Sequence, residues 1–135
     1  MMNKLILVFS SILISAMASA KVVELSTPEQ LKTELAKPGP GIVLLYSAPW
    51  CPGCQLFHPV YEKLSEKMKP IRFYDINIDV TAPLKEHEGM VPYIPTAFVG
   101  HSEDQLRNRP CRILNDDRDF DTVREEIEEC LRSTK

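Results

Sequence analysis

Hydrophobic residues follow two different patterns along this chain of 135 residues. Residues 42–46 form an unbroken apolar run that is rich in branched side chains, which is typical of a buried strand. Residues 55–68 carry apolar side chains at 56/57, 60/61, 64 and 68, which is the spacing of one helix face. The pattern therefore predicts a buried central strand that leads within a few residues into an amphipathic helix.

The remaining elements are predicted in the same way. Short apolar or alternating segments predict further strands at residues 21–25, 71–79, 96–99 and 110–114. Helical spacing and capping residues predict further helices at residues 28–36, 81–88 and 120–131. Residues 100–109 are mostly polar and are expected to form a loop. The order of elements predicts a βαβ unit around residues 42–79 within an α/β fold.

The first twenty residues have the pattern of a secretory signal peptide. Lys4 precedes an apolar stretch at 5–17, and Ala18-Ser19-Ala20 is a small-x-small cleavage site. The alternative is a retained membrane anchor, but the stretch is shorter than the ~20 residues of a spanning helix. We expect cleavage after Ala20 and export of a single domain, residues 21–135, for which the bacterial periplasm fits best.

Charge and cysteine content narrow the class of protein. The chain has 16 basic and 19 acidic residues, a net charge of −3, and no basic stripe, which argues against binding to nucleic acid. All four cysteines lie after the expected cleavage site. Export permits disulfides, so four cysteines fit either a disulfide framework or one catalytic and one structural pair.

Two of the cysteines, Cys51 and Cys54, lie where the central strand turns into the helix. The first turn of a helix has free N–H groups and the positive end of the helix dipole, which stabilise a thiolate at Cys51. Cys54 comes one turn later, close enough to form a disulfide with Cys51. Pro52 suits an early helical position because its missing N–H would have no partner there.

A structural disulfide or half of a zinc site are the alternatives for this Cys-x-x-Cys. Zinc would need a second close pair of ligands, but Cys111 and Cys130 lie far apart in the sequence and the histidines do not cluster with them. Haem attachment would need a histidine directly after Cys54, where the chain has Gln55. We therefore expect a redox pair with neither a metal nor another cofactor.

Residues around the pair resemble the active site of the thioredoxin superfamily. Trp50 stands directly before Cys51, Pro59 falls where thioredoxins carry a kinking proline in the helix, and residues 94–96 resemble the cis-proline motif. The resemblance covers roughly residues 22–100. It implies a thioredoxin-like three-layer α/β sandwich in which helices flank a mixed central sheet.

The resemblance also implies an activity, namely thiol–disulfide oxidoreduction on protein substrates. Cys51 would attack and Cys54 would resolve, while Trp50, Ile94 and Pro95 would bind substrate. The expected partners are protein thiols and disulfides, together with a membrane protein that resets the pair. The alternatives are a thioredoxin-fold binding module, which could carry Cu(I), and a reductase dedicated to one client such as apocytochrome.

The sequence departs from the family pattern in ways that affect the chemistry. Thioredoxins carry a buried Asp six residues before the first cysteine, as a base for the second, and this chain has Leu45 there. Asp75, where the family usually has Lys, is one substitute and water is the other. Pro52 and Gly53 offer no side-chain donor to Cys51, which favours a middling or reducing potential.

The last predictions concern residues outside the motif. If the helix at 120–131 folds back along the strand at 110–114, Cys111 and Cys130 return to the same end of the domain. We expect a structural disulfide between them, and two separate buried thiols are the alternative. The three histidines are expected at the surface; they are His58, His87 and His101.

Overall fold

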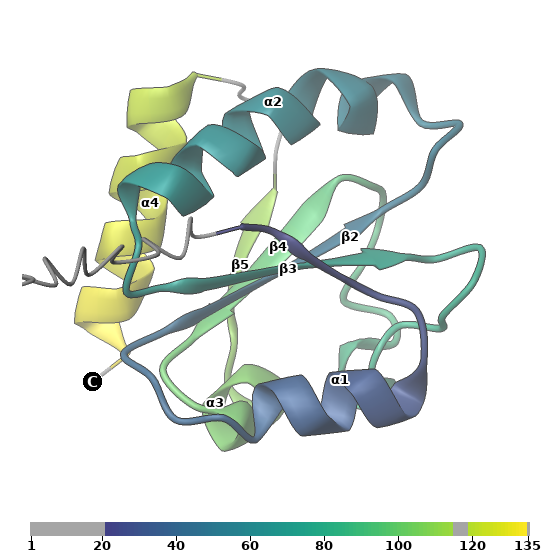
Figure 1. The fold of residues 1–135 in the computed structure, drawn as a ribbon, viewed down its shortest axis with the longest axis horizontal. Helices are drawn as coiled ribbons and strands as arrows, with labels where there is room; N and C mark the ends of the chain where they lie inside the picture. Colours follow the sequence, from purple (N-terminus) through teal and green to yellow (C-terminus); the bar gives the residue numbers. More distant parts are fainter. Residues whose placement is uncertain (1–20, 115–118, 135) are drawn as a thin grey trace, which may run out of the picture.

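A mixed β-sheet forms the middle layer of the computed structural model, which describes residues 21–114 and 119–134 (Figure 1). Within those residues the sheet has five strands in the spatial order β1-β3-β2-β4-β5. The strands are β1 Val23–Leu25, β2 Ile42–Ser47, β3 Arg72–Asn77, β4 Thr96–Gly100 and β5 Cys111–Leu114. The expected signal peptide, residues 1–20, lies outside the described residues.

The sheet is parallel on one side and antiparallel on the other. β1 and β2 both pair with β3 in parallel, whereas β4 pairs antiparallel with β2 and with β5. Neighbouring parallel strands need a crossover connection, and the helix between β2 and β3 supplies it. The predicted βαβ unit and the mixed sheet are confirmed.

Helices cover both faces of this sheet, which confirms the three-layer sandwich. They are α1 Pro28–Leu35, α2 Pro52–Lys67, α3 Glu103–Asn108 and α4 Phe120–Ser133. Figure 1 shows α2 and α4 on one face and α1 and α3 on the other. Among the described residues, none of these helices has the combination of length and apolarity needed to cross a membrane.

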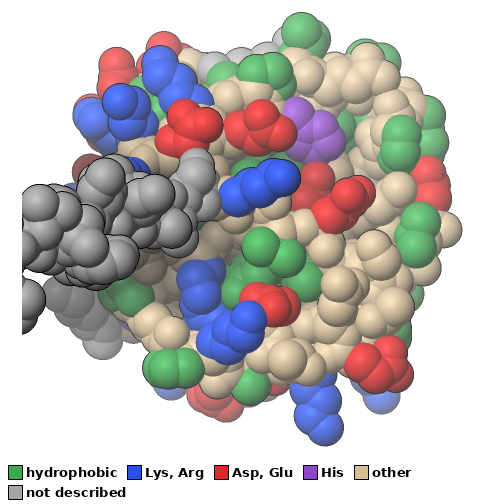
Figure 2. All heavy atoms as spheres, in the orientation of Figure 1, with side chains coloured by type: hydrophobic (Ala, Val, Ile, Leu, Met, Phe, Trp, Pro, Cys, Tyr) green, Lys and Arg blue, Asp and Glu red, His purple; other side chains and the backbone are tan. Residues whose placement is uncertain are grey.

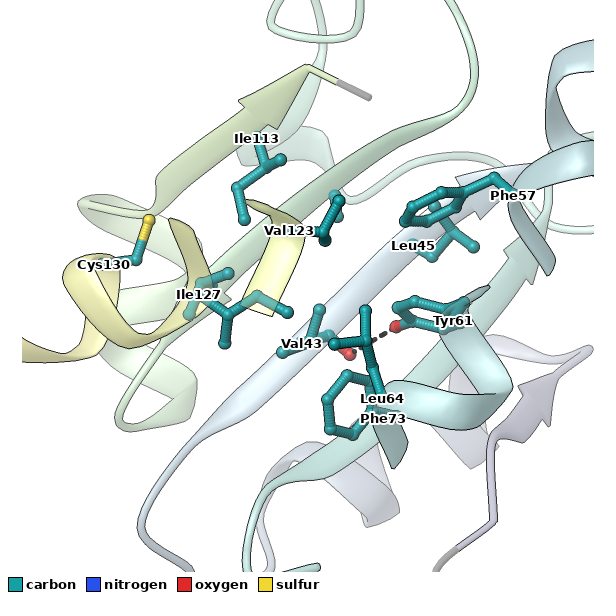
Figure 3. Packing of buried hydrophobic residues seen from close by; sticks show 12 residues of the cluster. Val43, Leu45, Phe57, Tyr61, Leu64, Phe73, Ile113, Val123, Ile127 and Cys130 are labelled. Atoms are coloured by element: carbon teal, nitrogen blue, oxygen red, sulfur yellow. Dashed lines mark hydrogen bonds between the residues drawn. The ribbon is translucent and has the colours of Figure 1, made fainter. Parts of the chain in front are cut away.

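The central strand β2 explains why the layers hold together. All six of its residues are buried, so its side chains, which point alternately to the two faces, enter both cores. On the face of α2 and α4, Val43 and Leu45 join Phe57, Tyr61 and Ile127 in one apolar cluster (Figure 3). The apolar run at 42–46 was therefore a correct indication of a strand covered on both sides.

The polar segment after β4 is where the sequence prediction was wrong. Residues expected to form a loop include α3, whose N-cap Ser102 accepts a hydrogen bond from the N–H of Gln105 at 3.3 Å. Leu106 is the buried residue of this helix, and its backbone lies so close to Gly100 that a Cβ there would come within 2.9 Å of the Leu106 nitrogen. Since one apolar residue makes no periodic stripe, the short helix had no hydrophobic signal.

The prediction of a helix at residues 81–88 is also wrong. The structure has only a 3₁₀ turn there, η1, Lys85–His87. Pro83 lies inside the expected helix, where its ring and its missing N–H oppose an α-helical interior. Gly89 does end the segment, in the left-handed region with φ of 77°.

His87 is fully buried, which corrects its expected place at the surface. Its ring stacks on Phe98, Nδ1 accepts a hydrogen bond from the Tyr46 hydroxyl, and Nε2 donates to the carbonyl of Leu106, both at 2.7 Å. Burial lowers the pKa of His87, so the neutral ring that these contacts require is favoured. His101 is only half-buried, with Nδ1 2.9 Å from the carbonyl oxygen of Pro40.

Cys111 and Cys130 form a disulfide in the structure, with their α-carbons 5.6 Å apart. Cys111 is paired across the sheet with Val99, whereas the active-site end of β4 is at Thr96. The bridge therefore joins α4 to the edge strand β5 at the far end of the sheet from Cys51. Its place, remote from the redox pair, fits the structural role expected for it.

Removing this bridge should cost about 3 kcal/mol of unfolding free energy, because a sequence separation of 19 residues closes a loop that restricts the unfolded chain. The double substitution of Cys111→Ala and Cys130→Ala, compared with wild type in urea without reductant, measures the loss. Reduced wild type serves as the control, since it breaks the bridge without changing the packing volume. A loss below about 1 kcal/mol, or free thiols at both positions in peptide mapping of unreduced protein, would contradict the assignment.

Candidate active site

Cys51 and Cys54 lie together at the start of α2, between the end of β2 and the first helical turn. Cys51 is the N-cap of the helix, and its Sγ accepts a hydrogen bond from the backbone N–H of Cys54 at 3.2 Å. Both are free thiols in this structure, with exposed fractions of 5% and 0%. The first turn of the helix thus directs a backbone N–H at the Cys51 sulfur, in the position that the sequence predicted.

The segment before β4 forms the opposite wall of the site. The Ile94–Pro95 peptide bond is cis, and the Cys51 thiol donates to the carbonyl oxygen of Ile94 at 3.6 Å. The Thr96 hydroxyl donates to the carbonyl oxygen of Tyr93 at 2.6 Å, which ties the segment to the first residue of β4. The structure therefore brings Ile94 and Pro95 to the reactive sulfur, although they are more than forty residues away in the sequence.

Trp50 lies outside the core, with 63% of its surface exposed. Its indole N–H points at the Asp79 carboxylate, 2.9 Å from Oδ2, so the ring is held in place by a charge-assisted hydrogen bond. Val80 and Tyr93 are exposed apolar side chains as well, at 65% and 41%. An exposed, fixed aromatic ring beside Cys51 fits the predicted substrate-binding role.

The supporting residues of the motif lie where the sequence placed them. Pro52 is the first residue of α2 and Gly53 follows it, so the missing N–H of the proline costs the helix no hydrogen bond. Pro59 lies inside α2 and is exposed. A proline there cannot donate to the carbonyl four residues earlier, and the interruption falls on the outer side of the helix.

Cys54 is held as a thiol by its surroundings. Burial raises the pKa of Cys54 to about 12, and the hydrogen bond with Cys51 and the negative charge of Asp75 act in the same direction. A thiol of this kind is a poor nucleophile until a base removes its proton. The environment therefore assigns first attack to the N-cap cysteine and leaves Cys54 in need of a base.

Asp75 provides a buried carboxylate on the face of the sheet that α2 covers. It lies on β3, directly across from Leu45 on β2, and only 9% of its surface is exposed. Its Oδ1 accepts a hydrogen bond from the Ser47 hydroxyl at 2.6 Å, and its Oδ2 lies 2.9 Å from Nε2 of His58. The structure thus places Asp75 in the active-site layer, while Leu45 is fully buried in the apolar cluster.

Sequence reasoning missed Ser47 and His58 as members of this network. His58 is half-buried rather than a free surface residue, and it follows Cys54 by four positions in α2. Residues four apart share a helix face, so this spacing was the signal that could have found it. Ser47 gave no signal, because its contact with Asp75 depends on the register of β2 against β3.

Within residues 21–114 and 119–134, no three His, Cys, Asp or Glu side chains are grouped so that they could hold an ion. The two active-site thiols alone would provide two soft ligands.

Comparisons with known proteins agree with this fold. The family model described as Thioredoxin matches residues 22–119. Thioredoxin of Mycoplasmopsis pulmonis is 32% identical over 60 residues, which cover 40% of this chain and 55% of that protein. Thioredoxin-2 of Dictyostelium discoideum is 33% identical over 60 residues, covering 44% and 66%. The alignment therefore spans between about half and two thirds of these curated relatives.

A structural comparison shows the same fold over a longer stretch. The crystal structure of thioredoxin from Trypanosoma brucei brucei superimposes with a TM-score of 0.67 and 15% identity, covering 87% of this chain and 96% of that one. The family match covers well over half of the chain. The chain belongs to the thioredoxin family.

Proposed function

We propose that this protein is an exported thiol–disulfide oxidoreductase that exchanges disulfides with protein substrates through Cys51 and Cys54. The observation that carries the proposal is the position of Cys51. Its sulfur is the N-cap of α2, accepts the N–H of Cys54, and faces the carbonyl oxygen of Ile94. A sulfur in this place receives a backbone N–H of the first helical turn and has a backbone edge beside it for an extended substrate.

The exchange runs in two steps with two electrons transferred. The Cys51 thiolate attacks one sulfur of a substrate disulfide, which forms a mixed disulfide and releases the first substrate thiolate. Cys54 then loses its proton and attacks Cys51, which forms the Cys51–Cys54 bond and releases the second substrate thiolate. The substrate disulfide is reduced and the protein pair is oxidised. The reverse sequence oxidises a dithiol.

Export and the resetting partner are parts of the proposal that rest on the sequence. The pattern at residues 1–20 supports secretion, for which the bacterial periplasm is the best-fitting compartment. A second protein must restore the pair after each cycle, and at an exported location we propose a membrane protein for this role. The chemistry uses only the two sulfurs and protons, so we propose that it needs no cofactor.

Reduction of insulin disulfides with dithiothreitol as electron source tests the activity. Wild type should accelerate the precipitation of insulin chains over dithiothreitol alone, and the variant with Cys51→Ser and Cys54→Ser should not. The double variant replaces each thiol by a hydroxyl, so a difference in rate from wild type reports on the two sulfurs. Equal rates for wild type and this variant would instead favour a binding module or a Cu(I) carrier. Activity confined to one client would favour a dedicated reductase.

A further inference from the structure

A surface cavity of about 210 Å³ lies at the end of the sheet opposite the active site. It is lined by the first residues of β3, by the edge strand β1 and by the C-terminal ends of α1 and α2. Arg72, one of its lining residues, pairs with Ile42 at the start of β2, whereas Cys51 follows the end of that strand. A ligand in this cavity would therefore leave the redox pair uncovered.

Most of the charge that lines the cavity is positive. Four cationic residues line it, namely Lys21, Lys37, Lys69 and Arg72, against the single carboxylate of Glu34. Lys37 is ion-paired with Glu34 at 2.6 Å, whereas Lys21, Lys69 and Arg72 have no described carboxylate within ion-pair distance. Figure 2 shows lysine and arginine side chains around an apolar patch and a carboxylate near the middle of this face. Uncompensated cations that share one small cavity create a potential that attracts anions.

Arg72 is held in one place at this cavity. Its Nη1 donates to the carbonyl oxygen of Glu34 at 2.5 Å and to the Tyr74 hydroxyl at 3.2 Å. A Cβ at Gly39 would come within 3.1 Å of Nε, so the backbone of Gly39 shelters that side of the guanidinium. Nε is buried and has no hydrogen-bond acceptor among the described residues. A buried donor on a cation without an acceptor is costly, and an oxyanion beside the guanidinium would offset part of that cost.

A structural role accounts for only part of this charge. Arg72 serves the last turn of α1 through the carbonyl of Glu34, and Lys37 pairs with the Glu34 side chain. Lys21 and Lys69 are exposed and are not used in this way. Cleavage after Ala20, which we expect from the sequence, would add an α-ammonium group at Lys21.

We propose that this cavity binds a phosphate monoester, with Lys21, Lys69 and Arg72 supplying the charge. A phosphate monoester carries about −1.5 to −2 charges at pH 7, which matches three unpaired cations better than a single carboxylate does. A guanidinium also presents a fork of donors that fits phosphate oxygens. The cavity is smaller than the roughly 300 Å³ at which pockets for drug-sized ligands begin, so the ligand group is small. Val23 and Phe73 also line the cavity and suit the carbon atoms next to the phosphate.

Two sources can present this chemical group. One is a small soluble ester such as glycerol 3-phosphate, and the other is the headgroup of phosphatidic acid in a membrane. Both carry a terminal phosphate on a glycerol carbon. Binding at this cavity uses neither of the active-site thiols, so it goes beyond the proposed function and is independent of it.

Titration of the ¹⁵N-labelled protein with glycerol 3-phosphate, followed by NMR at constant ionic strength, tests the site. Saturable shifts should appear at the amides of residues 71–74, and glycerol should produce none. The double substitution of Lys21→Gln and Lys69→Gln should weaken binding about tenfold, because each exposed charge contact contributes a few-fold. Both side chains are exposed, so their replacement leaves the core intact.

Lys32→Gln with Lys85→Gln is the matched control. It removes the same net charge from two exposed residues that do not line the cavity. This variant should bind glycerol 3-phosphate as wild type does. An equal loss in the two double variants would overturn the site, because binding would then follow net charge alone. Succinate that bound to the same amides as tightly as glycerol 3-phosphate would overturn the preference for phosphate.

Sedimentation with vesicles distinguishes the two sources, with wild type and variants carrying the same N-terminus. Phosphatidylcholine vesicles contain equal minor amounts of phosphatidic acid, a monoester, or of phosphatidylglycerol, a diester. For a lipid ligand, wild type should bind the phosphatidic acid vesicles about tenfold more tightly than the variant with Lys21→Gln and Lys69→Gln. Equal vesicle binding by the two, together with the NMR shifts, would assign the site to a soluble ester. Neither saturable shifts nor vesicle binding that depends on these lysines would overturn the proposal, whatever the insulin assay showed.

Discussion

Cys54→Ser should trap a disulfide substrate on Cys51 as a stable mixed disulfide. The Cys51 sulfur receives the N–H of Cys54 and has its place at the helix N-cap, whereas Cys54 is fully buried and kept protonated. Attack therefore begins at Cys51, and without the Cys54 sulfur nothing in the site releases the adduct. Mass spectrometry of the trapped species, followed by peptide mapping, locates the linkage.

Cys51→Ser is the paired variant for this experiment. It should form no mixed disulfide and should lose turnover by at least about a thousandfold, since a hydroxyl cannot replace a thiolate in disulfide exchange. Both variants keep Cys111 and Cys130, so any reaction at the second pair is visible in the same maps. An adduct on Cys54 or Cys111 would show that the nucleophile has been assigned wrongly.

Leu45→Asp should lower the unfolding free energy by about 4 kcal/mol at pH 7. Leu45 is fully buried against Phe57 and Tyr61, and its neighbour across the strand is Asp75 (Figure 3). A second carboxylate there would lose solvation and would face the like charge of Asp75. Urea denaturation of the variant against wild type gives the difference.

Leu45→Asn is the control, because it has nearly the same shape as aspartate without the charge. Part of the loss in Leu45→Asp should return when the pH falls from 7 to 5, since a carboxyl raised in pKa by burial takes up a proton there. The asparagine variant should show no such recovery. Equal stability of the two variants at pH 7 would mean that position 45 accommodates a charge and that the account of the Leu45 site is wrong.

The central part of the fold could be predicted from local sequence patterns. The run at residues 42–46 is buried on both faces, and the spacing in residues 55–68 is that of one packed helix face. These signals are strong because the hydrophobic core itself creates them. The strand β2, the helix α2 and the turn between them could therefore be predicted from the sequence.

The features that were predicted wrongly from the sequence are held in place by polar contacts. α3 has one buried residue, Leu106, and depends on its Ser102 cap and on the close approach to Gly100. His87 is buried because Tyr46 and the carbonyl of Leu106 satisfy both ring nitrogens, and those partners come from distant segments. Composition alone makes such a histidine look like a surface residue.

The active site likewise has one part that local sequence predicts and another part that depends on how the strands pair. Cys51, Cys54 and the helix between them are neighbours in the sequence, so their chemistry could be predicted from spacing. The network around Asp75 joins three elements, and only the register of β2 against β3 brings Ser47 to its carboxylate. From the sequence alone, Asp75 was one of two candidates, beside water, for the base that the family has at the position of Leu45. His58 was assigned no role.

The equilibrium of the Cys51–Cys54 pair with glutathione redox buffers tests the central claim most directly. Trapping the thiols by alkylation at each ratio of reduced to oxidised glutathione gives the fraction of oxidised protein. We expect one reversible two-electron transition confined to this pair, at a potential between roughly −180 and −270 mV because Pro52 and Gly53 offer Cys51 no side-chain donor. A pair that remains dithiol at every ratio would contradict the assignment of a redox site, and a transition near −120 mV would contradict the account of what stabilises Cys51.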